Sequence, residues 1–213
     1  TNVGTQVTNV FSVPTLVSNG HSYSTVAIGN QCWYAENVRY LPEVSPGFHG
    51  SEHDNSPHAY VYGYSDDNFT EASETFAYNR FGALYNFLAL ELWDLCPSGW
   101  RVPSDSDWVD LEIYIGMPDS LLFNEGARGS ISGVLKDAQN WNGSNETGFS
   151  ALPGGARSSI ASFNNSLGFA DGGFSGYFWS STSLPNTEDV WRRAFGTDST
   201  ISRLTRPVHQ GYS

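Results

Sequence analysis

The chain has 213 residues with 22 acidic and 10 basic side chains, so its formal net charge is −12. A field of this sign repels phosphate backbones, which argues against nucleic acid as a partner. The sequence has no apolar run of about 18 residues and therefore predicts no transmembrane helix. Aromatic residues make up 15% of the chain and charged residues only 15%, which excludes an intrinsically disordered protein.

Residues 1–20 contain no charged side chain and are rich in β-branched residues. They predict an extended N-terminal arm, which could pair with a sheet edge of another chain. A linker from a preceding domain explains the same composition. The chain begins at Thr1 without a basic segment followed by an apolar run, so we expect a processed product or a fragment. Residues 21–213 are expected to form a single domain.

The segment after this arm alternates in polarity and then becomes irregular. Residues 23–35 predict a β-hairpin that turns at Gly29 and Asn30. Residues 41–75 are rich in Pro, Gly, Asp and Ser and predict a long surface loop.

Within this loop, three histidines and two carboxylates occur in ten residues and could ligate zinc or another divalent ion. A solvated polar loop is the simpler explanation. The candidate metal ligands are His49, His53, Asp54 and His58.

Two helices are predicted in the middle of the chain. Apolar residues recur at helical spacing between Phe81 and Leu92, which predicts a helix over residues 84–93. A second helix is predicted over residues 104–115, with Ser104 as its N-cap and Asp107 at the capping-box position. Its acidic first turn is favourable to the helix dipole and needs no catalytic explanation.

The C-terminal half predicts strands separated by turns. The runs GYFWSST and VWRRAFG are strand-like, and Gly and Asn are frequent around them. With helices in the middle and strands towards both ends, the sequence predicts an α+β fold whose antiparallel sheet brings the ends of the chain together. Trp179 and Trp191 are expected to be core residues on these strands.

The order of motifs resembles the Fibrobacter succinogenes major paralogous domain family. The motifs are, in order, IGNQCWYAENVRY, RFGALYNFLAL, LCPSGWRVPSDSDWVDLE, LKDAQNW, GFSALPGGARSS, GYFWSSTS and VHQGYS. The resemblance covers about residues 21–213 and implies an exported protein, extracellular or at the cell surface. It also implies a C-type-lectin-like fold, similar to that of the formylglycine-generating enzymes: a small twisted antiparallel sheet, two helices and long irregular loops. Neither calcium-lectin signatures nor the redox-active cysteine pair of those enzymes is present.

The chain has two cysteines, Cys32 and Cys96. In an exported protein they are a candidate disulfide, although two unrelated thiols explain them equally well. Relatives commonly continue past the GYS motif with a further cysteine that could pair at the Cys96 position, which leaves the pairing open.

The sequence predicts binding rather than catalysis. It has no Gly-x-Ser-x-Gly motif, and no serine stands out as a nucleophile, so we expect a non-enzymatic protein. Trp141 lies in a polar loop and is the best candidate for an exposed aromatic that stacks on a ligand. The candidate ligand-binding residues are Trp141, Asn142, Asn145, Tyr177, Asp189 and Arg192.

We therefore expect an adhesion or binding module that recognises a glycan or a surface protein. No cofactor is expected, except a structural calcium ion, for which residues 64–68 and 169–173 could donate oxygen ligands. The alternative is a subunit of an extracellular filament that self-assembles through residues 1–20. An enzyme on the formylglycine-generating-type fold is a third hypothesis.

Overall fold

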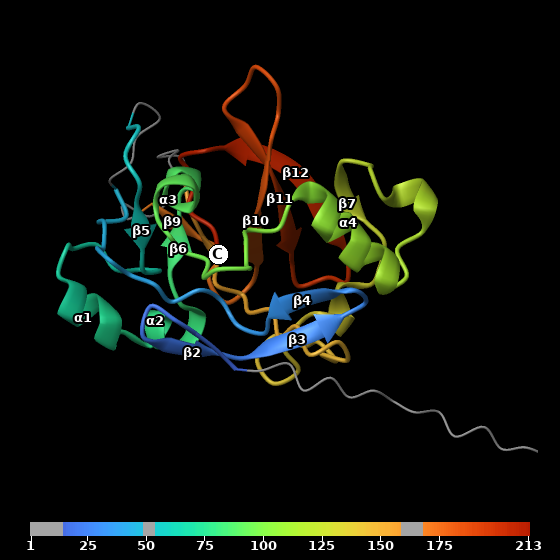
Figure 1. Ribbon diagram of the computed structural model, residues 1–213, viewed down its shortest axis with the longest axis horizontal. Coiled ribbons are helices and arrows are strands. Elements are labelled where there is room, and N and C mark those ends of the chain that lie inside the picture. Colours follow the sequence, from blue (N-terminus) through green and yellow to red (C-terminus); the bar gives the residue numbers. More distant parts are fainter. Residues whose placement is uncertain (1–14, 49–53, 159–167) are drawn as a thin grey trace, which may run out of the picture.

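The largest sheet is four-stranded and antiparallel. The computed structural model describes residues 15–48, 54–158 and 168–213. Within them the strand order is β10 (Gly176–Ser183), β11 (Asp189–Phe195), β12 (Ile201–Pro207) and β7 (Gly126–Arg128). Helix α4 (Asp105–Tyr114) contacts β10 and β11 and lies beside this sheet in Figure 1. Both strand-like runs predicted from the sequence, GYFWSST and VWRRAFG, are confirmed as β10 and β11.

Two hairpins form the N-terminal part of the described chain. Strand β1 (Leu16–Ser18) pairs with β2 (His21–Tyr23), so the last residues of the predicted arm belong to a hairpin. Residues 1–14, the greater part of that arm, lie outside the described residues. The predicted second hairpin is confirmed as β3 (Thr25–Ile28) and β4 (Gln31–Tyr34). Gly29 adopts a φ of +61° at its turn, a conformation that favours glycine.

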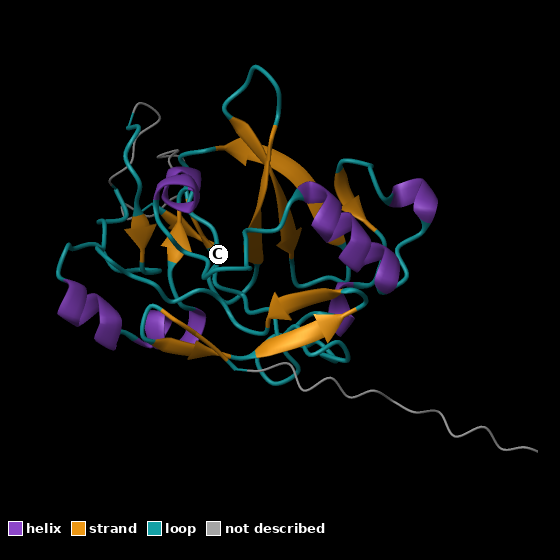
Figure 2. Cartoon of the chain, viewed as in Figure 1, coloured by secondary structure: helices purple, strands orange, loops and turns teal. Residues whose placement is uncertain are grey.

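Short strand pairs connect distant segments of the chain. Strand β5 (Ala59–Tyr60) pairs with β6 (Leu84–Tyr85), and β8 (Ala156–Arg157) pairs with β9 (Phe169–Ala170). Tyr212 near the C-terminus bridges to Tyr85, so the end of the chain lies in the interior of the fold. The remaining helical elements are α1 (Phe69–Glu74), α2 (Phe76–Phe81), α3 (Phe87–Leu92), η1 (Asp119–Leu121) and η2 (Ser132–Val134), shown in Figure 2.

The helix predicted over residues 84–93 is wrong in its first part. Helix α2 ends at Gly82, which has a φ of +74°, and Leu84 then begins strand β6. The Asn86 side chain starts a new helix by accepting a hydrogen bond from the Ala89 N–H. The loop predicted over residues 41–75 likewise contains β5 and α1. By contrast, helix α4 and its capping box between Ser104 and Asp107 are confirmed.

The main core is aromatic and lies between α4, the β3–β4 hairpin and the sheet. Trp108 is at its centre, with ring centroids 5.0 Å from Trp33, 5.9 Å from Phe178 and 6.0 Å from Phe149. Aromatic pairs at these separations contribute about 0.5–1.5 kcal/mol beyond their buried area. Trp179 and Trp191 are buried, as the sequence predicts.

A network of buried charges fixes α4 against the sheet. Glu112 accepts hydrogen bonds from both Arg128 (2.8 Å) and Arg193 (2.6 Å). Asp105 accepts from Arg193 and Arg203, each at 2.7 Å. All five side chains are largely withdrawn from solvent. Their charges are therefore stabilised by one another rather than by water.

The expectation of a mixed fold with a small antiparallel sheet and few helices is confirmed. Among the helices of the described ranges, none combines the length and the apolar character needed to cross a bilayer.

Candidate functional site

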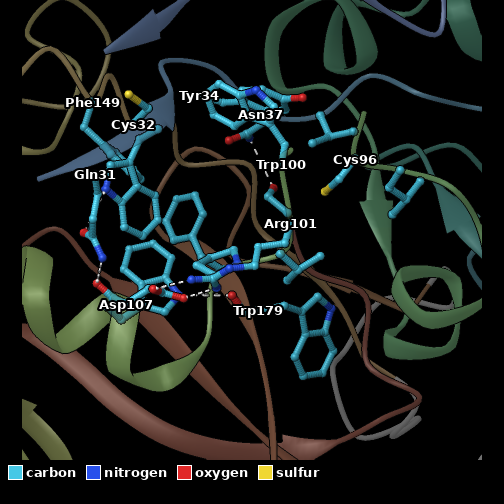
Figure 3. Close-up of a pocket in the computed structure, with 18 of the residues that line it drawn as sticks. Gln31, Cys32, Tyr34, Asn37, Cys96, Trp100, Arg101, Asp107, Phe149 and Trp179 are labelled. Atoms are coloured by element: carbon cyan, nitrogen blue, oxygen red, sulfur yellow. Dashed lines mark hydrogen bonds and ion pairs between the residues drawn. The ribbon is translucent and has the colours of Figure 1, made fainter. Parts of the chain in front are cut away.

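A cavity of about 430 Å³ opens between the β3–β4 hairpin and the segment 95–103. Figure 3 shows side chains from both walls converging on it. Its walls also include the start of α4, residues 149–151, strand β10 and the C-terminal Ser213. The aromatic, polar and thiol side chains of its lining include those of Gln31, Cys32, Trp33, Tyr34, Glu36, Asn37, Cys96, Trp100, Arg101, Asp107, Trp108, Phe149 and Ser213.

The segment 95–103 places its side chains through a tight turn. The Trp100 N–H donates to the Pro97 carbonyl at 2.9 Å, and Gly99 adopts a φ of +86°. A positive φ at the third position of a turn is the requirement of a type II turn, which only glycine meets without strain. The turn therefore directs Trp100 and Arg101 to the cavity wall. The segment that precedes the predicted N-cap Ser104 is therefore also a wall of this site.

One side of the cavity is a stack of aromatic rings. Tyr23 lies 4.7 Å from Tyr34 at an interplanar angle of 4°, and Tyr34 lies 4.9 Å from Trp100 at 29°. The Tyr34 hydroxyl is buried and has no hydrogen-bond partner among the described residues. Burial, with a smaller contribution from nearby Cys96, raises the pKa of Tyr34, so the hydroxyl stays protonated at neutral pH.

The polar groups at the cavity are held by hydrogen bonds. Gln31 donates its amide to the Asp107 carbonyl at 3.1 Å and accepts from the Trp33 indole at 3.2 Å. Asn37 donates to the Ser213 hydroxyl at 3.2 Å, on the other wall. Burial alone would raise the pKa of Glu36, but hydrogen bonds from the Ser24 N–H and other neighbours lower it, so it is ionised at neutral pH.

Arg101 and Asp107 form a bidentate pair beside the aromatic stack. Arg101 Nη2 donates to Asp107 Oδ1 at 2.8 Å, and Nη1 donates to the other carboxylate oxygen. The hydrogen bond from Arg101, with further ones from Ser104, lowers the pKa of Asp107 to about 2. The carboxylate therefore remains ionised at any pH near neutrality.

The depressed pKa of Asp107 predicts a loss of stability in acid. An unfolded aspartate titrates near pH 4, so the stabilisation is complete above that pH and disappears as the pH falls towards about 2. Asp107→Asn should cost about 1–2 kcal/mol at pH 7 after allowance for solvent screening. Urea unfolding at pH 7, 5, 3 and 2 measures this. The difference between wild type and variant should shrink between pH 5 and 2. Asp110→Asn, which removes a carboxylate from the exposed face of α4, is the control at the same pH values. A difference that is constant with pH would contradict the assignment.

A family model describes most of this chain. The model of the Fibrobacter succinogenes major domain matches residues 26–212. The chain belongs to this family. Its match begins in strand β3 and runs to Tyr212, so every wall of the cavity except Ser213 lies within the family domain. No curated protein and no solved structure matches the chain.

Both cysteines of the Fibrobacter succinogenes major domain line the cavity as free thiols. Cys32 lies on β4 and is exposed, while Cys96 lies on the segment 95–103 (Figure 3). The disulfide considered from the sequence is not formed in this structure, and the two sulfur atoms lie apart in Figure 3. Burial, and secondarily Asp94, raises the pKa of Cys96, so this thiol is protonated at neutral pH.

The structure corrects the sequence prediction for the loop at residues 139–147. Trp141 is buried rather than exposed, and its indole donates to the Phe174 carbonyl at 3.2 Å. Asn142 and Asn145 adopt positive φ values of 53° and 50°. The Asn145 side chain accepts from the Ser150 N–H at 2.8 Å, so its role is to hold the loop. None of these three residues lines the cavity.

The other predicted ligand-binding residues lie on β10 and β11, away from the cavity lining. Arg192 is 5% exposed, and its guanidinium lies 4.7 Å from the Tyr177 ring and 5.2 Å from the Tyr212 ring. Tyr177 donates its hydroxyl to Asp171 at 2.5 Å. Asp189 begins β11 and is half-buried. These contacts explain Tyr177 and Arg192 as parts of the packing around β10 and β11.

Of the predicted metal ligands, His49 and His53 lie outside the described residues. Asp54 and His58 are together, with His58 Nε2 2.8 Å from Asp54 Oδ2, and His58 Nδ1 is 2.8 Å from the Ser45 hydroxyl. In the described part of the chain, no group of three or more His, Cys, Asp or Glu side chains is placed to hold a metal ion. The calcium ion considered from the sequence stays a prediction.

Sequence reasoning missed the aromatic cavity of the Fibrobacter succinogenes major domain. Its rings come from residues as distant as Tyr34, Trp100 and Phe149, and no local pattern brings them together. One signal was available: Trp100 and Arg101 stand between two prolines in a turn, where a large apolar side chain has few core positions to fill.

Proposed function

We propose that this chain is a ligand-binding module of an exported, extracellular or cell-surface protein, and that the aromatic cavity holds a glycan. The observation that carries the proposal is a cavity of about 430 Å³ whose walls combine stacked aromatic rings with fixed amides and charged groups. Ligand sites are concave, mostly apolar and contain a few well-placed polar groups. The cavity has this character.

The chemistry of the walls favours a sugar ring over a phosphorylated or strongly acidic ligand. Aromatic faces pack against the apolar face of a sugar, while the Gln31 and Asn37 amides can pair with its hydroxyl groups. The net charge of −12 disfavours anionic ligands. An extended segment of a surface protein, with an aromatic side chain in the cavity, is the alternative ligand.

The cavity is proposed to bind without catalysis. Cys96 is kept protonated by burial, and the Ser213 hydroxyl is bonded to the Asn37 amide rather than to a base. Among the described residues that line the cavity, no nucleophile is hydrogen-bonded to a group able to take its proton. These features support retention of the ligand rather than its turnover.

A C-type-lectin-like fold is part of the same proposal. It is supported by the joining of the N- and C-terminal parts of the domain, where Tyr212 pairs with Tyr85 and Asn37 bonds to Ser213. It is also supported by the resemblance of the motifs, which implies export.

The proposal predicts that Trp100→Ala weakens ligand binding by about 30-fold. Removing an aromatic anchor from a binding site costs about 2 kcal/mol or more, because contact area and stacking are lost together. The measurement is an array of neutral glycans, with and without calcium, followed by titration calorimetry on any glycan retained. The matched control is Phe123→Ala, an exposed aromatic outside the cavity that is 69% exposed.

Two outcomes would contradict the proposal. One is a glycan that binds Trp100→Ala as tightly as wild type, which would place binding elsewhere. The other is a folded wild-type protein that retains no neutral glycan at millimolar concentration. In that case peptide arrays would test the alternative ligand class.

A further inference from the structure

A second cavity lies on another part of the domain and shares no residue with the aromatic one. Its volume is about 510 Å³, and its walls come from the segment 42–46, the segment 56–58 and the start of α1. Ser45 and His58 are both in these walls and both are buried, at 7% and 9% exposure.

Ser45, His58 and Asp54 form a continuous chain of hydrogen bonds. The Ser45 hydroxyl lies 2.8 Å from His58 Nδ1, and His58 Nε2 lies 2.8 Å from Asp54 Oδ2. An ionised carboxylate can only accept, so His58 Nε2 carries the proton of the neutral ring. Nδ1 then has a lone pair and accepts the hydrogen bond from Ser45. This is the arrangement of a serine hydroxyl with its general base.

The ionised state of Asp54 is supported by its surroundings. The Ser56 N–H donates to Asp54 Oδ1 at 3.0 Å, and His58 Nε2 lies 2.8 Å from Asp54 Oδ2, so both carboxylate oxygens are placed as hydrogen-bond acceptors. The carboxylate can therefore orient the imidazole and stabilise the imidazolium that forms when His58 takes a proton.

The backbone holds the three residues in place. The Ser45 N–H donates to the Ala59 carbonyl at 2.8 Å, which attaches Ser45 to strand β5. The Asn86 side chain accepts from the His58 N–H at 2.8 Å, and the Asn86 N–H donates to the His58 carbonyl at 3.1 Å. Asn86 is itself 1% exposed. Such support from a rigid frame is what a nucleophile and base require.

We propose that Ser45, His58 and Asp54 are a nucleophile, general base and orienting acid that hydrolyse a neutral carboxylic ester bound in this second cavity. This activity goes beyond the proposed binding function, rests on different residues, and would overturn the expectation of a non-enzymatic protein.

The reaction balances as two acyl transfers. Ser45 Oγ bonds to the ester carbonyl carbon while its proton passes to His58 Nδ1, and the imidazolium then gives that proton to the departing alkoxide or phenoxide. An acyl-serine and a free alcohol result. A water molecule next bonds to the acyl carbon, giving one proton to His58, and the acid leaves as that proton returns to Ser45 Oγ. Nothing is oxidised or reduced.

The cavity walls indicate the class of substrate. They combine apolar with polar side chains, the apolar ones being Pro42, Val44, Pro46, Pro57 and Phe69. The carboxylates of Glu43 and Asp67 disfavour anionic acyl groups. The Ser45 N–H is engaged with Ala59 and does not serve a developing oxyanion. We therefore infer esters with good leaving groups rather than peptide amides.

The test is active-site labelling of the intact chain with a fluorophosphonate probe, with proteolytic mapping of the modified residue. We expect the label on Ser45 in the wild type and none at that site in Ser45→Ala. His58→Gln should slow labelling and hydrolysis of p-nitrophenyl acetate by at least 100-fold, since a general base contributes about that factor or more. Ser73→Ala, which replaces a partly exposed serine of α1 outside the cavity, is the matched control and should label as the wild type does.

Circular dichroism and thermal unfolding of each variant separate loss of activity from loss of fold. If His58→Gln unfolds, Asp54→Asn serves in its place, with slower labelling expected from a folded protein. Folded wild type that is unlabelled at Ser45, or labelled at an equal rate when the base is replaced, overturns the proposal. Neither result bears on the aromatic cavity, because glycan binding is measured separately on Trp100→Ala.

Discussion

Replacing Glu112 by Gln is expected to lower the free energy of unfolding by about 3–5 kcal/mol. Glu112 is fully buried and accepts hydrogen bonds from the guanidinium groups of Arg128 and Arg193. The network around it holds three guanidinium groups against two carboxylates. Removing one carboxylate leaves two uncompensated positive charges in the interior. The cost is mainly that of burying these charges, and only partly that of the lost contacts.

The measurement is equilibrium unfolding in urea, monitored by tryptophan fluorescence. The control is Asp110→Asn, which removes the same kind of charge from the exposed face of the same helix and should change stability by less than about 0.5 kcal/mol. If Glu112→Gln lowered the free energy of unfolding by no more than the control does, the network of buried charges would not be what fixes α4 on the sheet.

Replacing Trp108 by Ala is expected to cost about 3–5 kcal/mol, the range for removing a large aromatic from a packed core. Trp108 is 2% exposed and contacts the rings of Trp33, Phe149 and Phe178. Its indole also donates to the Trp179 carbonyl at 3.2 Å, and the truncation leaves that buried oxygen unpaired. The same side chain lies in the wall of the aromatic cavity, so ligand binding should weaken as well.

Thermal and urea unfolding of Trp108→Ala give the stability change. The control is Ile113→Ala in the same helix. Ile113 is 49% exposed, so its truncation should lower the free energy of unfolding by about 1 kcal/mol or less. If Trp108→Ala were as stable as this control, the aromatic cluster would have to close around the gap at little cost. That result would contradict a tightly packed core around Trp108.

Local signals predicted those parts of the fold that depend on neighbouring residues. The capping box of Ser104 and Asp107, the turn at Gly29 and the strand-like run GYFWSST all depend on neighbouring residues, and each prediction is confirmed. The helix predicted over residues 84–93 is wrong in its first part for the opposite reason, while its second part is α3. Its periodicity was real, but the positive φ at Gly82 and the pairing of β6 with β5 overrode it. Tertiary pairing outweighs helix propensity in so short a segment.

The candidate sites depended on contacts that no sequence window contains. Trp141 sits among polar residues in the chain and was predicted to be exposed, yet it packs against Phe195, 6.3 Å away between ring centroids. The sequence predicts Asp54 and His58 as metal ligands. Their role is reinterpreted because the Ser45 hydroxyl, 13 residues before His58, lies within hydrogen-bond distance of the His58 ring. The aromatic cavity needed the whole fold before its walls could be seen together.

The long reach of the contacts around the aromatic cavity has a consequence for how the protein folds. Asn37 bonds to Ser213, 176 residues later, and the Trp179 indole donates to the Tyr85 carbonyl across 94 residues. Contacts this distant in sequence make folding slow, because much loop entropy is lost before they form. While the chain is synthesised from its N-terminus, the β3–β4 hairpin can form early, yet the segment 95–103 opposite it emerges later, and strand β10 and Ser213 complete the cavity last. Recognition is therefore acquired at the end of folding rather than built up along with the chain.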